Sequence, residues 1–397
     1  MTSIINFRRP LLIQGLSAPK GFGDSTLRDP RPDAIELLGG IPDPLLLPTD
    51  ELAEATARIL KQPGAPSLQY GRTEGLTLLR EWIADREQVP VEEILITNGG
   101  FHGLSLALSL VVERGDLVAV DNPVFPLFLR GLELNAGQIL PINVDNQGLV
   151  VDELEAQLLS GLRISALYTV PDFHNPTQAT LSDERRRKLV ELAERFGFIV
   201  IADNPYRELR FGPESADVTL FNTSNQVIHV NTFTKTLGPG LRLGWVRLPK
   251  HLIKDGVALR SRQDSHTSLL VQSVVADYLT SSPGVFDDLL DTARSVYRSR
   301  ALTLATALEK EAPGSFSIPV PEGGFFLWPK LTNPDIDSDK LAEAASAHGV
   351  EYQRGAFFSS GSGTDADRRL RLAYSNVNES QIAEAARRLA NALQSLG

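Results

Sequence analysis

A single lysine, Lys235, stands among small hydroxyl residues in the segment Asn231–Arg242. A lysine amine forms an imine with a carbonyl compound readily when its pKa is lowered. Thr232, Thr234 and Arg242 place hydroxyls and a planar cation near this lysine, and these are donors that suit a phosphate group. The segment therefore indicates a lysine that binds a carbonyl cofactor with a phosphate. A turn that carries one exposed lysine is the alternative interpretation.

A glycine-rich turn, Thr97–Gly103, offers a second part of such a phosphate site. The turn follows an apolar strand pattern and opens a helix, and backbone N–H groups at a helix start bind anions. We expect Gly99, Gly100 and Phe101 to supply these groups, although a strand-to-helix turn without a ligand has the same composition. His102 is either a second acid/base group or a histidine that is simply hydrogen-bonded at the helix start.

Five further residues could hold an aromatic ring and a substrate. Phe125 could stack on the ring, and the Asp203 carboxylate could keep a pyridine nitrogen protonated so that the ring accepts electrons. Asn175 and Tyr206 could hydrogen-bond to a phenolic oxygen of the ring. Arg371 lies in a mostly apolar strand pattern and needs an anionic partner, for which a substrate carboxylate is one candidate. The alternative interpretations are a core phenylalanine for Phe125, a cap or turn residue for Asp203 and Asn175, and a structural ion pair for Arg371.

The composition limits the class of protein. The chain has 397 residues, of which 42% are apolar and 22% charged, as is ordinary for a globular enzyme. It contains no cysteine, which excludes disulfides, thiolate metal sites and a cysteine nucleophile, and we predict no metal site. The net charge of −10 argues against general nucleic-acid binding. We see no signal peptide and no apolar run that could span a bilayer, so we expect a cytoplasmic enzyme without a membrane partner.

Helical and strand patterns alternate through the first two thirds of the chain. Helices are expected over Glu51–Lys61, Leu76–Arg86, Leu104–Arg114, Val151–Ser160 and Ser182–Phe196. Apolar strands are expected over Ile94–Thr97, Leu117–Val120, Gly137–Val144, Ile164–Val170, Phe198–Ala202 and Val227–Val230. This pattern predicts an α/β fold with a mostly parallel central sheet covered by helices on both faces. Ligands bind at the carboxyl ends of such strands, where most of the candidate residues stand.

A different pattern follows from about residue 287. A long helix, Asp291–Glu311, leads into strands over Phe316–Ile318, Gly324–Trp328 and Arg369–Tyr374 and helices over Ser338–His348 and Glu379–Leu396. We therefore expect a large cofactor-binding domain over 46–290 and a smaller α+β domain over 291–397. The N-terminal segment 1–45 is expected to pack with the small domain and the active site.

Taken together, these motifs resemble the fold type I, pyridoxal-phosphate-dependent aminotransferases of class I/II. Within them the chain is most similar to the kynurenine/2-aminoadipate aminotransferase group. The resemblance covers nearly the whole chain and includes Leu37–Pro44, Leu68–Gly75 and Pro321–Phe325. The same pattern occurs in the aminotransferase-like domains of certain bacterial regulators.

The resemblance implies pyridoxal 5′-phosphate as the cofactor. Lys235 would form the Schiff base, an internal aldimine, and would then move the proton between the substrate Cα and the cofactor. Asp203 would pair with the pyridine nitrogen, Asn175 and Tyr206 would bind the 3′-oxygen, and Phe125 would stack on the ring.

The resemblance also implies two further groups of contacts. The α-carboxylate of the substrate would be bound by Arg371, Asn175 and the backbone at Gly40. The active unit would be a homodimer with shared active sites, because one phosphate contact comes from a second subunit. The phosphate contacts would be Gly99, Gly100, Phe101, Thr232, Thr234 and Arg242, with Tyr70 from the second subunit.

Three positions depart from the family pattern. Gln178 replaces the glycine that usually follows Asn-Pro-Thr, and glycine there relaxes a turn. The phosphate loop reads Gly100-Phe101-His102 where polar side chains are usual, so the cradle would depend on backbone donors. The usual acidic run reads Ala202-Asp203-Asn204, which retains the aspartate.

The implied function moves the amino group of an L-amino acid to a 2-oxo acid. A β-lyase, decarboxylase, racemase or cyclase could use the same site, because the outcome depends on which bond stands perpendicular to the ring. A non-enzymatic ligand-binding domain is a further alternative, which the acidic net charge disfavours. Lys20 and Arg28 lie where some members hold a second substrate carboxylate, but no motif marks either residue and we assign no such site.

Overall fold

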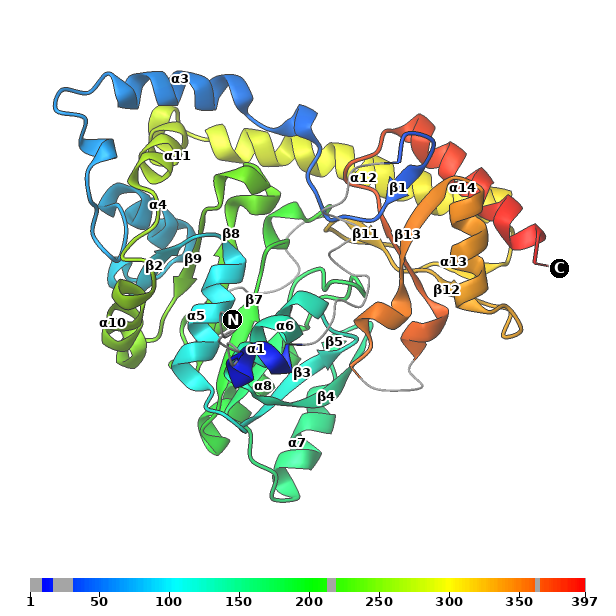
Figure 1. The fold of residues 1–397 in the computed structure, drawn as a ribbon, viewed down its shortest axis with the longest axis horizontal. Helices are drawn as coiled ribbons and strands as arrows, with labels where there is room; N and C mark the ends of the chain where they lie inside the picture. The colour runs from blue at the N-terminus through cyan, green and yellow to red at the C-terminus, as the bar shows by residue number, and fades with distance from the viewer. Residues whose placement is uncertain (1–8, 17–30, 213–218, 361–364, 397) are drawn as a thin grey trace, which may run out of the picture.

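The computed structural model describes residues 9–16, 31–212, 219–360 and 365–396 (Figure 1). Its largest element is an eight-stranded sheet of order β2-β9-β8-β7-β6-β3-β4-β5. All neighbouring pairs are parallel except those that involve β9 or β5. The strands are β2 (Ile94–Thr97), β3 (Leu117–Asn122), β4 (Gln138–Asp145), β5 (Gly148–Leu149), β6 (Ala166–Thr169), β7 (Ile199–Asp203), β8 (Val227–Thr232) and β9 (Gly244–Arg247). The predicted α/β class with a mostly parallel sheet is confirmed.

Helices cover both faces of this sheet because successive side chains of each strand point to opposite sides. Val118 and Val120 of β3 pack with α5 (Gly100–Val111) and α6 (Pro126–Asn135). Ala119, between them, packs with α7 (Val151–Leu159) and α8 (Asp183–Phe196) on the other side. The remaining helices of this region are α3 (Thr49–Leu60), α4 (Thr77–Glu87), α9 (Thr219–Asn222), α10 (Ile253–Gln263) and α11 (Leu269–Ser281).

The sequence patterns predicted most of these elements, but they missed helices α6, α9, α10 and α11 and strands β5 and β9, and the start of α5 differs as well. Helix α5 begins at Gly100 and not at Leu104, because Gly99 takes a positive φ of 82° and lets the backbone turn directly from β2 into the helix. Strand β9 was not predicted, because its short run Gly244–Arg247 carries an arginine and a glycine. Arg247 is nevertheless buried, and it donates to the Glu93 carboxylate at 2.7 Å.

A second sheet joins the two ends of the chain. Its order is β1-β13-β14-β11, with β1 (Ile35–Leu37) parallel to β13 (Val350–Arg354) and β14 (Leu370–Ala373) antiparallel to both of its neighbours, β13 and β11 (Phe326–Leu327). Helices α12 (Val285–Glu311), α13 (Ser338–Ala347) and α14 (Glu379–Gln394) share one apolar core with it. Strands β10 (Phe316–Ser317) and β12 (Lys330–Leu331) form a separate pair, and a short helix, α1 (Leu11–Gly15), lies near the N-terminus. The pairing of β1 with β13 supports the proposed packing of the N-terminal segment with the small domain, whereas α12 runs across the proposed boundary at residue 290.

The segment after β1 is tied to the small sheet by buried polar contacts. Arg300 of α12 donates to the Asp43 carboxylate at 2.5 Å and to the Ser375 carbonyl at 2.7 Å. The Ser375 hydroxyl donates to the Ile41 carbonyl at 2.6 Å. These contacts hold residues 39–41 between the two sheets. Among the described residues, no helix combines the length and the apolar content needed to cross a membrane.

Candidate active site

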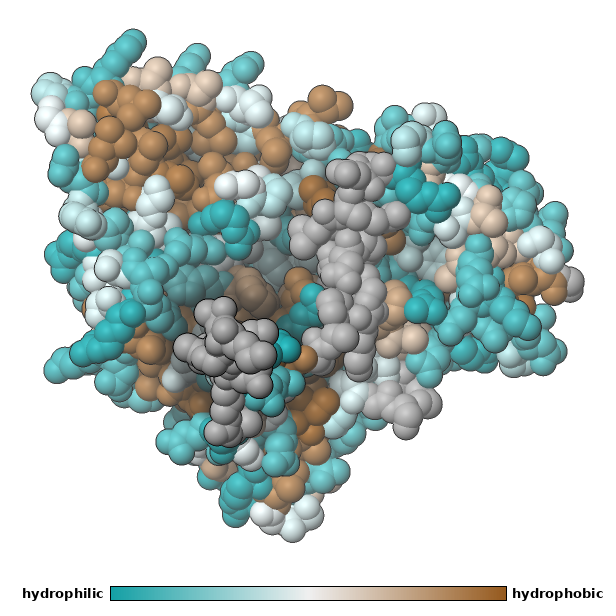
Figure 2. All heavy atoms as spheres, in the orientation of Figure 1, coloured by the Kyte–Doolittle hydropathy of each residue, from teal (hydrophilic) through white to brown (hydrophobic). Residues whose placement is uncertain are grey.

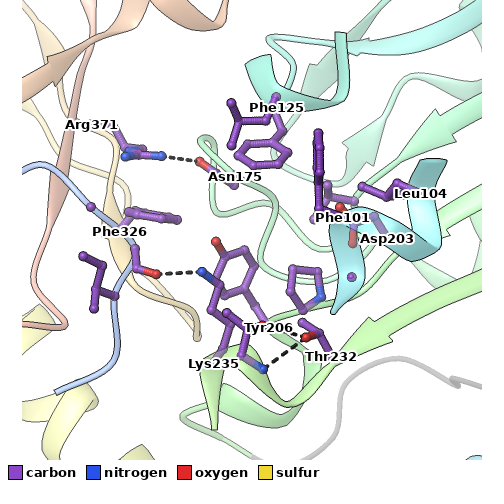
Figure 3. Close-up of a pocket in the computed structure, with 18 of the residues that line it drawn as sticks. Phe101, Leu104, Phe125, Asn175, Asp203, Tyr206, Thr232, Lys235, Phe326 and Arg371 are labelled. Atoms are coloured by element: carbon purple, nitrogen blue, oxygen red, sulfur yellow. Dashed lines mark hydrogen bonds between the residues drawn. The ribbon is translucent and has the colours of Figure 1, made fainter. Parts of the chain in front are cut away.

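A cavity of about 400 Å³ lies between the carboxyl ends of the large-sheet strands and the small sheet. Figure 3 shows Lys235, Asp203 and Arg371 around this one space. The structure brings together every predicted site residue except Gly99 and Tyr70. Those that line the cavity are Gly40, Gly100, Phe101, Phe125, Asn175, Asp203, Tyr206, Thr232, Thr234, Lys235, Arg242 and Arg371.

Lys235 ends a short 3-10 turn, η5 (Phe233–Lys235), that directly follows β8. The turn forms here because the Thr232 side chain accepts a hydrogen bond from the Thr234 N–H at 3.1 Å. The Lys235 amine donates to the Gly40 carbonyl at 2.7 Å. Its removal from water lowers the pKa of the amine to about 8; the positive charge of Arg371 acts in the same direction and the Asp203 carboxylate opposes it. The unprotonated fraction of this amine near neutral pH is therefore much larger than that of an ordinary lysine, which favours its action as a nucleophile and a base.

An anion cradle lies beside the lysine. The N-terminus of α5, the two threonine hydroxyls and the Arg242 guanidinium converge on it, which gives backbone donors, hydroxyls and a fixed cation. The Thr232 and Thr234 hydroxyl oxygens lie 2.7 Å apart. Arg242 donates to the Asn98 carbonyl at 3.2 Å, and a Cβ at Gly99 would lie only 2.7 Å from its Nη2 atom. Gly99 therefore allows the guanidinium to reach the cradle without itself lining the cavity.

Asp203 lies in the same cavity, at the end of β7. The residue is only 6% exposed, and burial raises the pKa of its carboxyl to about 7. The hydroxyl of Tyr168 donates to its Oδ2 atom at 2.9 Å. A carboxylate at this place suits a ligand whose ring nitrogen carries a proton.

Arg371 approaches from the small sheet. Its guanidinium is fully buried, donates to the Asn175 amide oxygen at 3.0 Å and to the Leu38 carbonyl, and lies 4.1 Å from the centre of the Phe326 ring. Burial lowers the pKa of this guanidinium. Burial raises the pKa of the neighbouring Tyr206 phenol, whereas Arg371 and a hydrogen bond with Asn175 act against that rise. The arrangement places a planar cation and an amide at the cavity wall, which suits a carboxylate.

Two departures from the family pattern have structural explanations. Gln178 takes a φ of +70°, the conformation for which glycine is usually needed. With the amide oriented so that its nitrogen faces these acceptors, Gln178 donates to the Gly323 carbonyl at 2.8 Å and to the Phe326 carbonyl at 3.0 Å, and the glutamine thereby ties this turn to the small sheet. His102 does not line the cavity, since its Nδ1 atom accepts from the Asn98 N–H at 3.1 Å. The histidine therefore stabilises the helix start, and its position does not suit a second acid/base group.

Tyr70 lies outside the cavity of its own chain and is 93% exposed. Lys20 and Arg28 lie outside the described residues. Sequence reasoning also missed residues that the structure places at the site. Ile41, Leu127 and Phe326 line the cavity. The apolar run Gly324–Trp328 predicted a strand, but it did not indicate which of its two phenylalanines, Phe325 or Phe326, lines the cavity.

The donor set fits pyridoxal phosphate. The cradle suits its phosphate, the Asp203 carboxylate suits its protonated ring nitrogen, and the Lys235 amine can condense with its aldehyde. A Cβ at Gly40 would lie 2.6 Å from the Phe326 ring, so the packing of this backbone against that ring requires glycine. The geometry of the cavity therefore agrees with the cofactor that the sequence motifs imply.

Comparisons with known proteins agree with this geometry. A family model described as aminotransferase class I and II matches residues 39–389. The aromatic-amino-acid aminotransferase 1 of Thermococcus litoralis is 32% identical over 374 residues, which cover 91% of this chain and 88% of the relative. The 2-aminoadipate transaminase of Thermus thermophilus is 33% identical over 372 residues, which cover 92% and 91%. The crystal structure of an alpha-aminoadipate aminotransferase from Thermus thermophilus, complexed with N-(5′-phosphopyridoxyl)-L-leucine, has a TM-score of 0.88 and 30% identity, and the match covers 97% of both chains.

The Lys235 amine is predicted to titrate well below an ordinary lysine. In protein free of cofactor, we expect its labelling by a small acylating reagent to be half-maximal near pH 8. Replacing Asp203 with asparagine should lower this midpoint, because the carboxylate raises the pKa of the amine. Mass spectrometry of the labelled peptide measures the profile, with the exposed Lys250 in the same sample as reference. A midpoint close to 10.5, the ordinary value, would contradict the prediction.

Proposed function

The chain belongs to the aminotransferases of class I and II and is a pyridoxal-phosphate-dependent transaminase, and we propose that the cavity around Lys235 is its active site. One observation carries the assignment: the Lys235 amine, the Asp203 carboxylate and the guanidinium groups of Arg242 and Arg371 line a single cavity. The reaction moves the amino group of an amino acid to a 2-oxo acid.

The proposed roles of the residues follow from their chemistry. When bound, pyridoxal phosphate supplies an aldehyde that condenses with amines and a protonated ring that accepts electrons from the substrate Cα. Arg242 and the start of α5 bind its phosphate, whereas Asp203 holds the proton on its ring nitrogen. Asn175 and Tyr206 orient the 3′-oxygen, and Phe125 packs against the ring.

Arg371 and Asn175 bind the substrate carboxylate and thereby orient the Cα–H bond across the ring plane. Lys235 then removes the proton from the Cα and returns it to the cofactor carbon. The lowered pKa of its amine suits a base that works near neutral pH. The Gly40 carbonyl, which accepts from this amine, aims it into the cavity.

Replacement of Lys235 by alanine should abolish both cofactor attachment and turnover. We expect the purified variant to show no visible absorbance from attached pyridoxal phosphate and no borohydride-stable label at position 235. Activity should fall by at least ~10⁴-fold, because the nucleophile and the base are lost together. A Lys250→Ala variant, changed at an exposed lysine outside the cavity, serves as control. Normal turnover in the position-235 variant would refute the assignment.

The proposed active unit is a homodimer with shared sites. Large apolar side chains stand exposed at Leu45 (90%), Leu68 (60%) and Tyr70 (93%). Figure 2 shows an apolar patch over the region of α3 and α11, and the turn that contains Leu68 packs against α11. Exposed apolar patches of this kind mark association surfaces. A second copy of the chain would cover the patch, and Tyr70 would then reach the phosphate cradle of that copy.

Mixed dimers test whether Tyr70 serves the other subunit. A Lys235→Ala chain and a Tyr70→Ala chain, refolded together, can form hybrids in which one of the two sites has both native residues. We expect activity to rise above that of either parent, toward roughly a quarter of the wild-type value for random pairing. Differently tagged subunits and steady-state assays measure this. Activity equal to the average of the two parents would contradict a shared site.

We propose aromatic and other large apolar amino acids as preferred donors. Relatives are named for aromatic amino acids and for 2-aminoadipate. The cavity carries the apolar side chains Ile41, Leu127 and Phe326 beside Arg371. Apolar walls favour an apolar side chain by burial of its surface.

A panel of donors with 2-oxoglutarate or pyruvate as acceptor tests this preference. We expect phenylalanine or leucine to exceed aspartate in kcat/KM by at least ~10-fold, which is the scale of discrimination by an apolar pocket. An Ile41→Lys variant should narrow or reverse the difference, since it places a cation beside the donor side chain. A wild-type preference for dicarboxylic donors would overturn the proposal.

We further propose a cytoplasmic location. The fractions of apolar and charged residues, 42% and 22%, are those of an ordinary globular enzyme. The sequence contains no cysteine, which fits a reducing compartment.

A further inference from the structure

Asp203 has a hydrogen-bond partner deep in the core of the large sheet, and the two residues form a unit. We propose that Tyr168 is a positioning residue for the reaction: its hydroxyl orients the Asp203 carboxylate toward the cavity and stabilises its charged form. This inference rests on the proposed role of Asp203 at the ring nitrogen. Tyr168 does not line the cavity and acts only through Asp203.

The geometry of the contact is well defined. Tyr168 lies on β6 and Asp203 ends the adjacent parallel strand β7, where Tyr168 is paired with Ile201. The Tyr168 side chain is fully buried, and its hydroxyl donates to Oδ2 of Asp203 at 2.9 Å. This bond occupies Oδ2 and leaves Oδ1 as the atom that can face a ring nitrogen. The carboxylate plane is thereby oriented before any ligand binds.

An aromatic stack keeps the phenol in place. The ring of Phe128, from α6, lies parallel to the Tyr168 ring, with the centroids 3.6 Å apart and the planes within 8°. Both residues are completely buried in the core between α5, α6 and the sheet. A phenol packed in this way cannot turn its hydroxyl away from Asp203 without opening the core. The stack therefore makes the hydrogen bond a fixed feature of the fold.

The charges around Asp203 explain why such a donor matters. The pKa of the Asp203 carboxyl is raised to about 7, chiefly by burial, and the nearby Asp121 carboxylate acts in the same direction. The hydrogen bond from Tyr168 and the positive charge of Lys235 lower it. The fourth neighbour, Tyr206, is neutral at the relevant pH, because burial raises the pKa of its phenol. Of these four neighbours, Tyr168 is a neutral group that donates a hydrogen bond to the Asp203 carboxylate. It therefore stabilises the charged form of Asp203 even when the Lys235 amine is uncharged.

Loss of the hydroxyl should shift the pH dependence of cofactor binding in a defined direction. A hydrogen bond to the charged form lowers a carboxyl pKa, so Tyr168→Phe raises the pKa of Asp203. Pyridoxal phosphate with a protonated ring nitrogen binds the carboxylate form. Below this raised pKa the Asp203 carboxyl of the variant must lose a proton before pyridoxal phosphate binds, so the affinity for the cofactor falls as the pH falls. This loss of affinity should begin at a higher pH in the variant than in the wild type.

The experiment measures the dissociation constant of pyridoxal phosphate for the cofactor-free protein between about pH 6 and pH 9. At a pH well below the pKa of Asp203, a rise of one unit in that pKa should weaken binding about tenfold. For Tyr168→Phe we expect binding weakened ~10-fold near pH 6.5 and within about 2-fold of wild type near pH 9. The acid limb of the kcat profile should also move to higher pH. Circular dichroism confirms that the variant is folded.

Two controls separate positioning from packing. Tyr352→Phe removes another buried hydroxyl, one without a hydrogen-bond partner in the described part of the chain, and should leave the binding profile unchanged. In an Asp203→Asn background the side chain cannot titrate. There the Tyr168→Phe change should add less than about 2-fold to the dissociation constant, because coupled residues act as a unit.

Several outcomes would overturn the inference. One is a Tyr168→Phe variant that melts at a lower temperature yet binds pyridoxal phosphate with the wild-type pH profile. Another is an effect equally large in the Asp203→Asn background. If Tyr168→Phe does not fold, Phe128→Leu decides the matter: it keeps the hydroxyl but loosens the ring, and an unchanged profile refutes the proposal. If Asp203→Asn alone leaves cofactor binding unchanged at every pH, the proposed role of Asp203 itself fails.

Discussion

The rest of the structure depends on one constraint: Lys235, Asp203 and Arg371 carry opposite charges and are removed from water in the same small cavity. Burying a charge costs several kcal/mol unless polar partners replace the lost water. Here each charged group has such a partner: Tyr168 donates to Asp203, the Gly40 carbonyl accepts from Lys235, and the Asn175 amide oxygen accepts from Arg371. Desolvation lowers the pKa of the lysine and raises that of the aspartate, so both lie near neutral pH.

These partners come from distant parts of the chain, and the two-sheet architecture brings them together. The large sheet presents the carboxyl ends of β7 and β8 at one edge, whereas β14 of the small sheet supplies the arginine. The N-terminal segment lies between the sheets, held by the buried pair of Asp43 and Arg300. Its backbone carbonyl therefore reaches the lysine although the two residues are 195 positions apart. The site is a product of both sheets and of the segment between them.

Much of the fold followed from local sequence signals. Near-continuous apolar runs predicted the parallel strands because both faces of those strands are buried. The rule that ligands meet at strand ends placed Asp203 and Lys235 correctly at the edge of the sheet. Strand β9 escaped prediction, since its buried arginine is stabilised by Glu93, a partner that local pattern does not reveal. Phe326 and Tyr168 escaped for a related reason: an apolar strand does not show which of its faces meets a ligand or a carboxylate.

The amino-acid sequence by itself determined the alternation of strands and helices in the large domain and the kinds of functional groups that stand after the predicted strands. It also identified the family, because motifs such as Asn231–Arg242, which combine a lysine, hydroxyls and an arginine, resemble those of the class I/II aminotransferases. Only the tertiary structure decided which of these groups lose their water, which hydroxyl faces Asp203 and which side chains meet across the cavity. Those properties depend on distances between segments far apart in the chain, and electrostatic energies change steeply with both distance and burial.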